Sequence, residues 1–299
     1  MHESVEFRIP EENAAEFLPP GTGSRIGYGI RKVVVDVRDP LFPELRRVHQ
    51  RVKERGGSLF AGWEIRRRYT RRELAAAELL YVWPKRLFAP AGEECGTVYD
   101  ESAACHHAFS RSPATEFYGR EACALVDACG VGARQVTPLC IDGRRLPSGT
   151  DFAQTIAGEI VVSRRVADVF RAENLSGAEF NPVLFSNTRG PRSDTHFQLS
   201  AVGEPVEISD ATRAGSTPFD DAAYGRCPYG HLIGINLLSE VTVIATSSPQ
   251  PDLMATRQMV GIRRGLLRPR PLLLFSPRAW RAVEGAKLSG LGVEVARLS

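Results

Sequence analysis

The stretch GEIVVSRRVADVFRAENLSGAEF, residues 158–180, decides the fold that we expect. Its apolar, β-branched run predicts a strand, and Ser163 follows as a helix N-cap whose hydroxyl can accept a bond from a free amide of the first turn. Val166 and Phe170 then lie on one stripe of the helix. Gly177, in the triplet LSG, favours the left-handed conformation that ends a helix. A second strand follows, so the stretch predicts a strand–helix–strand unit.

A second stretch, PLLLFSPRAWRAVEGAKLSGLGVEV at residues 271–295, repeats this order of elements. When Ser163 is aligned with Ser276, the two LSG triplets coincide without a gap. Pro277 comes next, and proline suits the first position of a helix. Any two short strand–helix–strand units could share the general pattern, but the ungapped LSG is more than the pattern requires. We therefore predict an α+β fold whose mixed α/β body contains a duplicated unit.

The length of the chain allows either one large domain or two ordinary ones. It has 299 residues, of which 43% are hydrophobic, which is enough for a sizeable core. No long polar linker divides it, so one continuous globular domain is the alternative to a division. The segments that we predict are an N-terminal helical and strand region at 1–90, a cysteine-rich knuckle-like segment at 91–140, and an α/β body at 141–299 with the duplicated unit at 158–185 and 271–298.

The N-terminal region shows one strand and two helices. The run KVVVDV predicts a strand, and the glycine-rich stretch before it is a loop, because a dinucleotide loop would follow a strand and open a helix. Apolar periodicity predicts a helix over residues 39–57. A second helix is predicted over residues 69–84, where Thr70 and Glu73 have the spacing of a capping box and Pro84 ends the helix.

Composition and charge exclude several classes of protein. The chain carries 38 Lys and Arg against 35 Asp and Glu, so it lacks the basic excess of a dedicated nucleic-acid binder. One arginine-rich stretch, from Leu45 to Arg72, is a local candidate, and its simpler interpretation is two solvated helix faces. No secretory signal or membrane-length apolar run is present. We expect a cytoplasmic protein with reduced cysteines, in which clustered thiols indicate metal binding or burial.

Four of the six cysteines fall in one short region. They form no C-x-x-C pair, but ECG at Cys95 and ACG at Cys129 each resemble the second half of a zinc knuckle, where a glycine lets the backbone turn its amides toward the sulfur. Structural zinc requires about four such ligands. The ligands that we predict are Cys95, Cys105, Cys123 and Cys129, with His106, His107, or Cys227 and His231 of the tight CPYGH sequence as alternatives to Cys123.

The sequence contains no complete catalytic set. It has no G-x-S-x-G elbow and no His-Glu-His constellation that would point to a hydrolase or a catalytic zinc. Cys105 is followed directly by two histidines, but adjacency in sequence does not give the geometry that a thiol nucleophile and its base require. We therefore predict no catalytic residue and no organic cofactor.

Three stretches carry a resemblance to known families. CGTVYDESAAC at 95–105, CGVGARQVTPL at 129–139 and GEIVVSRRVADVF…LSGAEFNPV resemble bacterial double-CXXCG motif proteins, although both CXXCG pairs lack their first cysteine here. The second half also resembles immunity proteins of polymorphic toxin systems. The resemblance covers about Ala91 to Val183, with an echo at the C-terminus. It implies a cysteine knuckle attached to an α/β body that binds a partner protein, such as a cognate toxin.

The function that we expect is therefore a non-enzymatic, cytoplasmic protein-binding protein with a structural zinc site, and by resemblance an immunity protein. A zinc-ribbon-like, nucleic-acid-associated protein that uses the arginine-rich stretch is one alternative. An enzyme that uses the thiols and histidines is another. The sequence does not indicate an oligomeric state.

Overall fold

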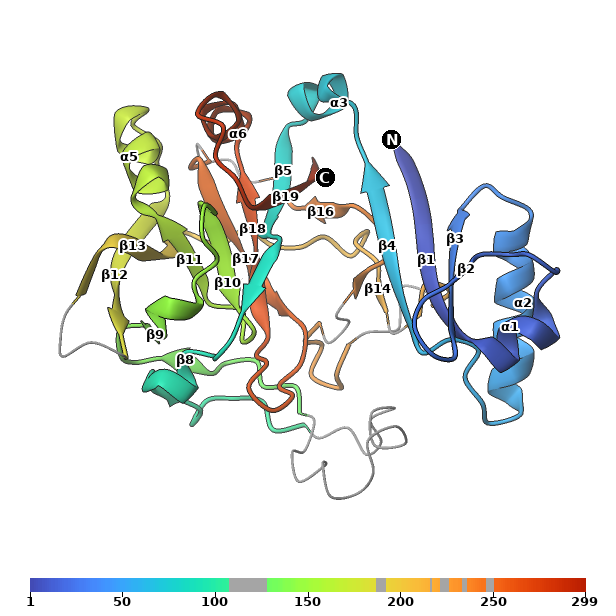
Figure 1. The fold of residues 1–299 in the computed structure, drawn as a ribbon. Helices are drawn as coiled ribbons and strands as arrows, with labels where there is room; N and C mark the ends of the chain where they lie inside the picture. Colours follow the sequence, from blue (N-terminus) through green and yellow to red (C-terminus); the bar gives the residue numbers. More distant parts are fainter. Residues whose placement is uncertain (108–127, 187–191, 216, 221–225, 233–235, 246–249) are drawn as a thin grey trace.

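The computed structural model describes residues 1–107, 128–186, 192–215, 217–220, 226–232, 236–245 and 250–299. Helices and many strands are both present, as the predicted α+β class requires (Figure 1). The strands of the described residues form three larger sheets and two small pairs.

The N-terminal part of the chain forms a four-stranded antiparallel sheet in the order β2-β3-β1-β4. Val5 and Phe7 of β1 pack with Leu45 and Val48 of the long helix α2, as the apolar spacing of that helix predicts. The elements are β1 (His2–Pro10), α1 (Glu11–Phe17), β2 (Ser24–Arg25), β3 (Ile30–Asp36), α2 (Leu41–Glu54) and β4 (Gly62–Arg68).

Two larger sheets make up the rest of the molecule. The six-stranded sheet has the order β6-β10-β11-β13-β12-β9, and the five-stranded sheet has the order β16-β19-β5-β18-β17. The first contains β6 (Arg86–Phe88), β9 (Cys140–Ile141), β10 (Phe152–Thr155), β11 (Ile160–Ser163), β12 (Ala178–Phe185) and β13 (Arg192–Ala201). The second contains β5 (Leu79–Pro84), β16 (Val241–Val243), β17 (Leu253–Val260), β18 (Arg270–Phe275) and β19 (Leu291–Leu298).

The smaller elements lie around these sheets. One pair of short strands, β7 with β8, lies in the cysteine-rich segment, and the other, β14 with β15, lies near the five-stranded sheet (Figure 1). The remaining elements are α3 (Arg71–Ala76), η1 (Glu93–Cys95), β7 (Tyr99–Asp100), β8 (Arg134–Gln135), η3 (Gly143–Arg145), α5 (Arg164–Ala172), β14 (Ala214–Gly215), β15 (Asn236–Leu237) and α6 (Pro277–Gly285).

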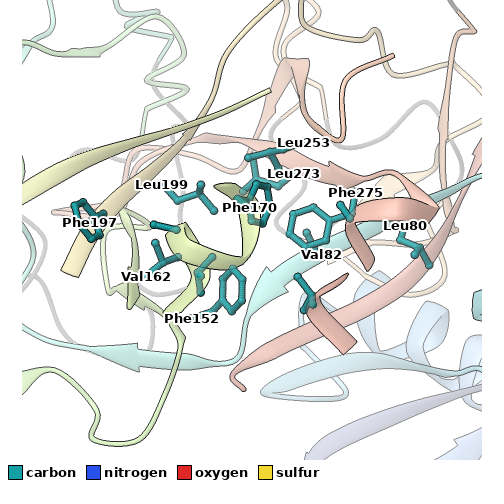
Figure 2. Packing of buried hydrophobic residues seen from close by; sticks show 14 of the residues in the cluster. Leu80, Val82, Phe152, Val162, Phe170, Phe197, Leu199, Leu253, Leu273 and Phe275 are labelled. Atoms are coloured by element: carbon teal, nitrogen blue, oxygen red, sulfur yellow. The ribbon is translucent and has the colours of Figure 1, made fainter. Parts of the chain in front are cut away.

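One hydrophobic core joins the two larger sheets. Helices α5 and α6 lie side by side over it (Figure 1), and their buried residues Phe170 and Val283 belong to the same cluster as Val162 of the six-stranded sheet and Leu80 of the five-stranded sheet. Figure 2 shows Phe170 and Phe275 close together within this cluster, with ring centroids 6.0 Å apart. Each such buried side chain contributes about 1.5–3 kcal/mol relative to an exposed one. The core therefore ties both sheets into one packed body.

The prediction of one helix over residues 69–84 is wrong. These residues form a short helix followed by a strand. The capping box is present: Thr70 Oγ1 accepts from the Glu73 amide at 3.2 Å, and Glu73 Oε2 accepts from the Thr70 amide at 2.7 Å. The helix α3 ends at Ala76, and β5 begins at Leu79. The reason is tertiary, because β5 is paired on both sides, with β18 and β19, and its alternate side chains are buried on both faces of the sheet.

Two buried carboxylates connect the segments at 158–185 and 271–298. Asp151 Oδ1 accepts from the Ser163 hydroxyl at 2.7 Å, and its Oδ2 accepts from Arg165 Nη1 at 3.0 Å. The same Oδ2 accepts from the amide of Ser289, in the distant LSG triplet, at 2.9 Å. Asp151 thus bonds both to the start of α5 and to the turn after α6.

Asp252 makes the equivalent contacts with the two helices exchanged. It bonds to the start of α6 and to the turn after α5. Its Oδ1 accepts from the Ser276 hydroxyl at 2.7 Å, and its Oδ2 accepts from Arg278 Nη1 at 3.2 Å and from the Ser176 amide at 2.9 Å. The side chains of Asp151 and Asp252 are 5% and 7% exposed. A buried charge is costly unless it is paired and hydrogen-bonded, so these contacts constrain both helix–turn connections.

The ends of the two helices differ in detail from the prediction. Ser276 accepts a capping bond from Ala279, but the Ser163 hydroxyl makes no such bond and is donated to the nearby aspartate instead. The left-handed residues at the helix ends are Asn174 and Lys287, at φ 49° and 52°, and not the LSG glycines. The capping rule predicts the position of these turns but not which residue takes the strained conformation.

The LSG glycines instead permit a close approach of two backbones. A Cβ atom on Gly177, at φ +84°, would lie 2.2 Å from the Leu253 carbonyl oxygen, and one on Gly290, at φ +97°, would lie 2.3 Å from the Phe152 carbonyl oxygen.

We predict that Gly177→Ala lowers the free energy of unfolding by about 2–4 kcal/mol through clash and backbone strain. Gly203→Ala, at a positive φ with open space, should cost only about 1 kcal/mol. Urea denaturation measures both, and equal losses would contradict the prediction.

The charge of Asp252 makes part of the stability dependent on pH. Burial alone would raise its pKa, but the Ser176 amide, the Ser276 hydroxyl and the Arg278 charge together hold the pKa below its usual value. A lowered pKa in the folded state contributes stability above the unfolded value, near 3.9, and that contribution is lost as the pH falls through the folded value.

We therefore predict that Asp252→Asn lowers the free energy of unfolding at neutral pH by about 1–3 kcal/mol. The difference from the wild-type protein should shrink as the pH falls below about 4. Urea denaturation at a series of pH values measures this difference. Asp210→Asn, which changes a fully exposed side chain, is the control and should have little effect. A loss at Asp252 that is the same at every pH would contradict the assignment.

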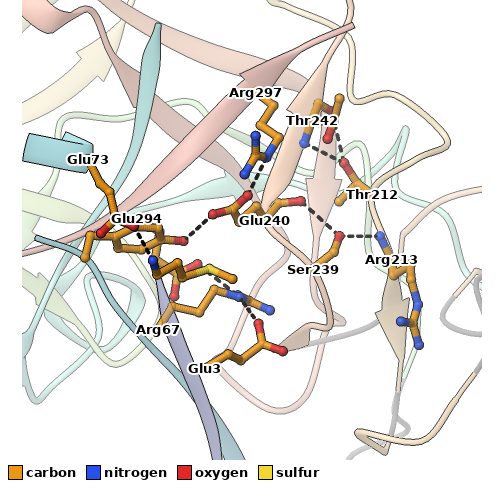
Figure 3. A network of polar contacts seen from close by, with 12 residues as sticks. Glu3, Arg67, Glu73, Thr212, Arg213, Ser239, Glu240, Thr242, Glu294 and Arg297 are labelled. Atoms are coloured by element: carbon orange, nitrogen blue, oxygen red, sulfur yellow. Dashed lines mark hydrogen bonds and ion pairs between the residues drawn. The ribbon is translucent and has the colours of Figure 1, made fainter. Parts of the chain in front are cut away.

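A network of ion pairs joins the N-terminal sheet to the five-stranded sheet (Figure 3). Arg67 of β4 is 2% exposed and donates to Glu3 Oε2 at 2.6 Å and to Glu294 Oε2 at 2.9 Å. Next to it, Tyr69 donates to Glu240 Oε1 at 2.8 Å. Because Glu3 lies in β1 and Glu294 in β19, the guanidinium of Arg67 bridges two sheets.

Candidate metal centre

Three cysteines and one histidine converge beside the small β7–β8 pair. They are Cys105, Cys129, Cys227 and His231, and their ligand atoms all lie within 4.8 Å of one another. Cys129 and Cys227 are buried, while Cys105 and His231 are partly exposed. The four residues could hold a metal ion, and thiolate with imidazole is the donor set that zinc takes in structural sites.

The two distances from His231 to the buried sulfurs are close to those of a tetrahedral zinc site. Zn–S bonds of about 2.3 Å and Zn–N bonds of about 2.0–2.1 Å place sulfur and nitrogen about 3.6 Å apart on a tetrahedron. The Nδ1 atom of His231 lies 3.3 Å from Cys129 Sγ and 3.4 Å from Cys227 Sγ. The histidine nitrogen therefore already faces both buried sulfurs at nearly the separation that a shared ion requires.

The sequence CPYGH forms a tight turn that brings its two ligands together. The Cys227 amide donates to the His231 carbonyl at 2.9 Å, and the Gly230 amide donates to the Cys227 carbonyl at 2.8 Å. Gly230 has φ +83°, a conformation that glycine adopts at little cost. Because the turn is closed by its own backbone bonds, the two ligands of this half of the site are fixed by local sequence.

The other half is built from two segments far apart in sequence. The Cys105 amide donates to the Val131 carbonyl at 2.7 Å, and the Gly130 amide donates to the Cys105 carbonyl at 2.8 Å. Gly130 is at φ +72°, and a Cβ there would lie 2.5 Å from Arg263 Cβ. The glycine after Cys129 is therefore required both by its own turn and by the chain that packs against it.

Backbone amides point at two of the sulfurs, as in a zinc knuckle. The amide of Val131 donates to Cys129, and the amides of Tyr229 and His231 donate to Cys227. Burial raises the pKa of Cys129 to about 12. Burial alone would also raise the pKa of Cys227. There the amide bonds and the neighbouring thiols have the larger effect, and together they lower the pKa. A bound cation would offset the cost of placing several thiolates together.

The structure brings together two of the four predicted ligands. Cys105 and Cys129 belong to the group, whereas Cys95 does not. Cys95 lies in η1, near Cys140. Burial raises the pKa of Cys140, and the charge of Cys95 adds to that rise. Gly96 does adopt the left-handed turn expected after ECG, at φ +108°. Cys123 lies outside the described residues.

The remaining two ligands come from CPYGH, which the sequence left as an alternative. Neither His106 nor His107 belongs to the group within the part of the chain that the structure describes. His107 instead accepts the Cys129 amide through its carbonyl and places its ring edge-on to Tyr229. The C-x-x-x-H spacing of CPYGH was the sequence signal for these two ligands. CPYGH lies about a hundred residues from Cys129, and only the folded structure shows that the two segments meet.

The arginine-rich stretch is not two helix faces, because its second half is the strand β4. Guanidinium groups of this stretch are engaged in ion pairs: Arg67 is buried between two glutamates, Arg66 pairs with Glu6 at 2.8 Å and with Glu64 at 3.0 Å, and Arg47 pairs with Glu44 at 3.7 Å. These pairs leave less positive charge for a phosphate backbone than the sequence alone indicates.

The chain matches no protein-family model and no curated protein. Within the described residues, no helix is both long enough and apolar enough to cross a membrane.

Metal analysis of two matched variants tests the centre. We predict that protein purified without chelator contains stoichiometric zinc and that Cys227→Ser loses it. An ion present at about a thousandfold its Kd stabilises the folded state by about 4 kcal/mol, so the variant should also unfold more readily. Cys95→Ser is the control, and it should keep both the ion and the stability of the wild-type protein. Zinc-free wild-type protein, or loss of zinc in Cys95→Ser, would contradict the assignment.

Proposed function

We propose that the chain is a non-enzymatic, protein-binding protein in which a structural zinc ion fixes a surface loop for contact with a partner. The four convergent ligands carry this proposal. A structural zinc site is closed by four protein ligands, whereas a catalytic site keeps one position for water or substrate. Three cysteines and a histidine complete the tetrahedron, so the ion would hold the loop rather than perform chemistry.

The burial of Cys129 and Cys227 argues against a nucleophile at either of these two thiols, whereas Cys105 is partly exposed. His231 Nδ1 is close to two sulfurs, and such a pair could in principle activate a thiol. Cys129 is fully buried, however, and Cys227 is 4% exposed, so a substrate would not reach either sulfur. A reactive cysteine needs partial exposure. The same arrangement suits a metal ion.

The zinc-held loop presents an aromatic side chain to solvent. Tyr229 lies between Cys227 and His231 and is 73% exposed. At the end of the β7–β8 pair, Val98 and Val136 are also exposed and adjacent, since the Val136 amide donates to the Val98 carbonyl at 3.0 Å. Exposed tyrosine on a rigid loop is typical of protein–protein contact surfaces. This surface is where we place the partner.

The rest of the body serves as a rigid scaffold built from the duplicated unit. The matching contacts of Asp151 and Asp252 support the duplication, because each bonds the serine and arginine that begin one helix and the LSG turn that follows the other. A cognate toxin as partner follows from the resemblance to immunity proteins, and we place the protein in the cytoplasm. A reducing compartment would keep the thiols available for zinc.

Co-expression with the product of the gene next to its own tests the proposed function. We expect that product to arrest growth when expressed alone, and the present chain to restore growth and co-purify with it. Tyr229→Ala should weaken the complex about tenfold or more, because buried tyrosines are frequent interface hot spots. Tyr28→Ala, at a fully exposed tyrosine in the N-terminal part, is the matched control and should bind like wild type.

Unchanged growth arrest and separate elution of the two proteins would reject the partner. The nucleic-acid alternative gives a different result: affinity for duplex DNA or RNA that falls steeply with added salt. Anisotropy titrations at low and physiological salt separate the two functions.

A further inference from the structure

A pocket separate from the metal centre lies on the five-stranded sheet. Its volume is about 420 Å³, within the roughly 300–1,000 Å³ of sites that hold small ligands. Tyr81 and Trp83 of β5 line it with rings 5.0 Å apart, and Arg270 of β18 lies beside them. The opposite face of the same strand carries Leu80 and Val82 into the core under α6, whereas Tyr81, partly buried against the second hydrophobic cluster, lies on the face that lines the pocket.

One wall of the pocket is aromatic, and a glycine on the neighbouring strand leaves room for it. Trp83 is paired in register with Gly292 of β19, and a Cβ on that glycine would lie 2.3 Å from the indole ring. The absence of a side chain at Gly292 therefore lets the indole lie flat on the neighbouring strand. Large apolar side chains are exposed around the same pocket: Leu87 at 62%, Ile156 at 36% and Leu267 at 44%.

The hydrogen-bond donors of the pocket are only partly paired among the described residues. Arg270 donates to the side-chain oxygen of Gln154, and among the described residues it forms no ion pair. The Tyr81 hydroxyl has no partner within the same part of the chain, and the Arg270 charge is near enough to oppose the rise in its pKa that burial causes. Arg268 also lines the pocket, and its buried Nε has no partner there.

The acidic groups of the pocket do not neutralise these donors. Glu294 is bonded to the buried Arg67 at 2.9 Å, and Glu64 is paired with Arg66 at 3.0 Å. Both carboxylates are therefore already satisfied by other guanidinium groups. The positive charge of Arg270 remains next to an aromatic wall and an apolar rim.

We propose that this pocket binds a small monoanion that carries a flat apolar group, such as an aromatic carboxylate. The anion would accept from Arg270 and the Tyr81 hydroxyl, and its flat body would lie against Trp83. A charge-assisted bond to a guanidinium is stronger than a neutral one, and partial burial strengthens it further. The site does not depend on the zinc ion or on a protein partner, so it stands or falls independently of the proposed function.

Titration with 2-naphthoate and its neutral amide tests the site. Calorimetry on the full chain should show the acid binding about tenfold or more tightly than the amide. Arg270→Gln should raise the Kd of the acid by a similar factor and abolish the preference for acid over amide. Arg281→Gln changes an exposed arginine of α6 and should leave both affinities unchanged.

Arg270→Lys guards against a loss of folding, since it keeps the charge at the same position. It should retain the preference for the acid over the amide, with a reduced affinity because lysine lacks the guanidinium fork. No binding of either compound at millimolar concentration, equal affinities for acid and amide, or wild-type binding by Arg270→Gln would each overturn the proposal.

Discussion

Two buried aspartates hold the body of this protein in one arrangement. Asp151 and Asp252 each accept from a serine and an arginine at the start of one helix and from an amide in the turn after the other helix. Removing either end of such a contact would leave a charge buried without its partner, which costs more than the pair itself contributes. The two helices, their turns and the sheets beneath them are therefore positioned together rather than independently.

The two LSG glycines act with these carboxylates. The backbone at Gly177 approaches Leu253 of β17, and the backbone at Gly290 approaches Phe152 of β10, so closely that only a residue without Cβ fits at either glycine. The backbone bonds that accompany the approach, from Leu253 to the Ser176 carbonyl at 3.0 Å and from Phe152 to the Ser289 carbonyl at 3.1 Å, continue the same pattern. Packing, hydrogen bonding and charge thus favour a single relative position of α5 and α6.

The candidate metal centre depends on a different kind of constraint, because short-range backbone bonds bring its ligands together. CPYGH closes on itself, while Cys105 and Cys129 come from two other segments that backbone bonds hold together, such as the one from the Gly130 amide to the Cys105 carbonyl. An ion shared between them would add stabilisation, since metal affinity contributes directly to folding free energy. A loop fixed in this way can expose Tyr229 without losing its conformation, which is what a binding surface requires.

Both candidate sites lie on elements that the packed body positions. The pocket beside Arg270 lies on the face of the five-stranded sheet opposite its helix, and the knuckle lies next to the small β7–β8 pair. Neither depends on the other for its residues. The chain therefore carries both candidate sites on one folded body.

The sequence alone determined the features that depend on neighbouring residues. Strand and helix within residues 158–185 and 271–298, the cap at Ser276, the capping box at Thr70 and the turn glycine after Cys129 all follow from short-range propensity and spacing. Tertiary structure decided the rest. Pairing on both edges made a strand of residues 79–84, which carry a helical pattern, and folding alone chose Cys227 and His231 over Cys95 as neighbours of Cys129. Contacts across a hundred residues depend on the path of the whole chain, which local pattern does not encode.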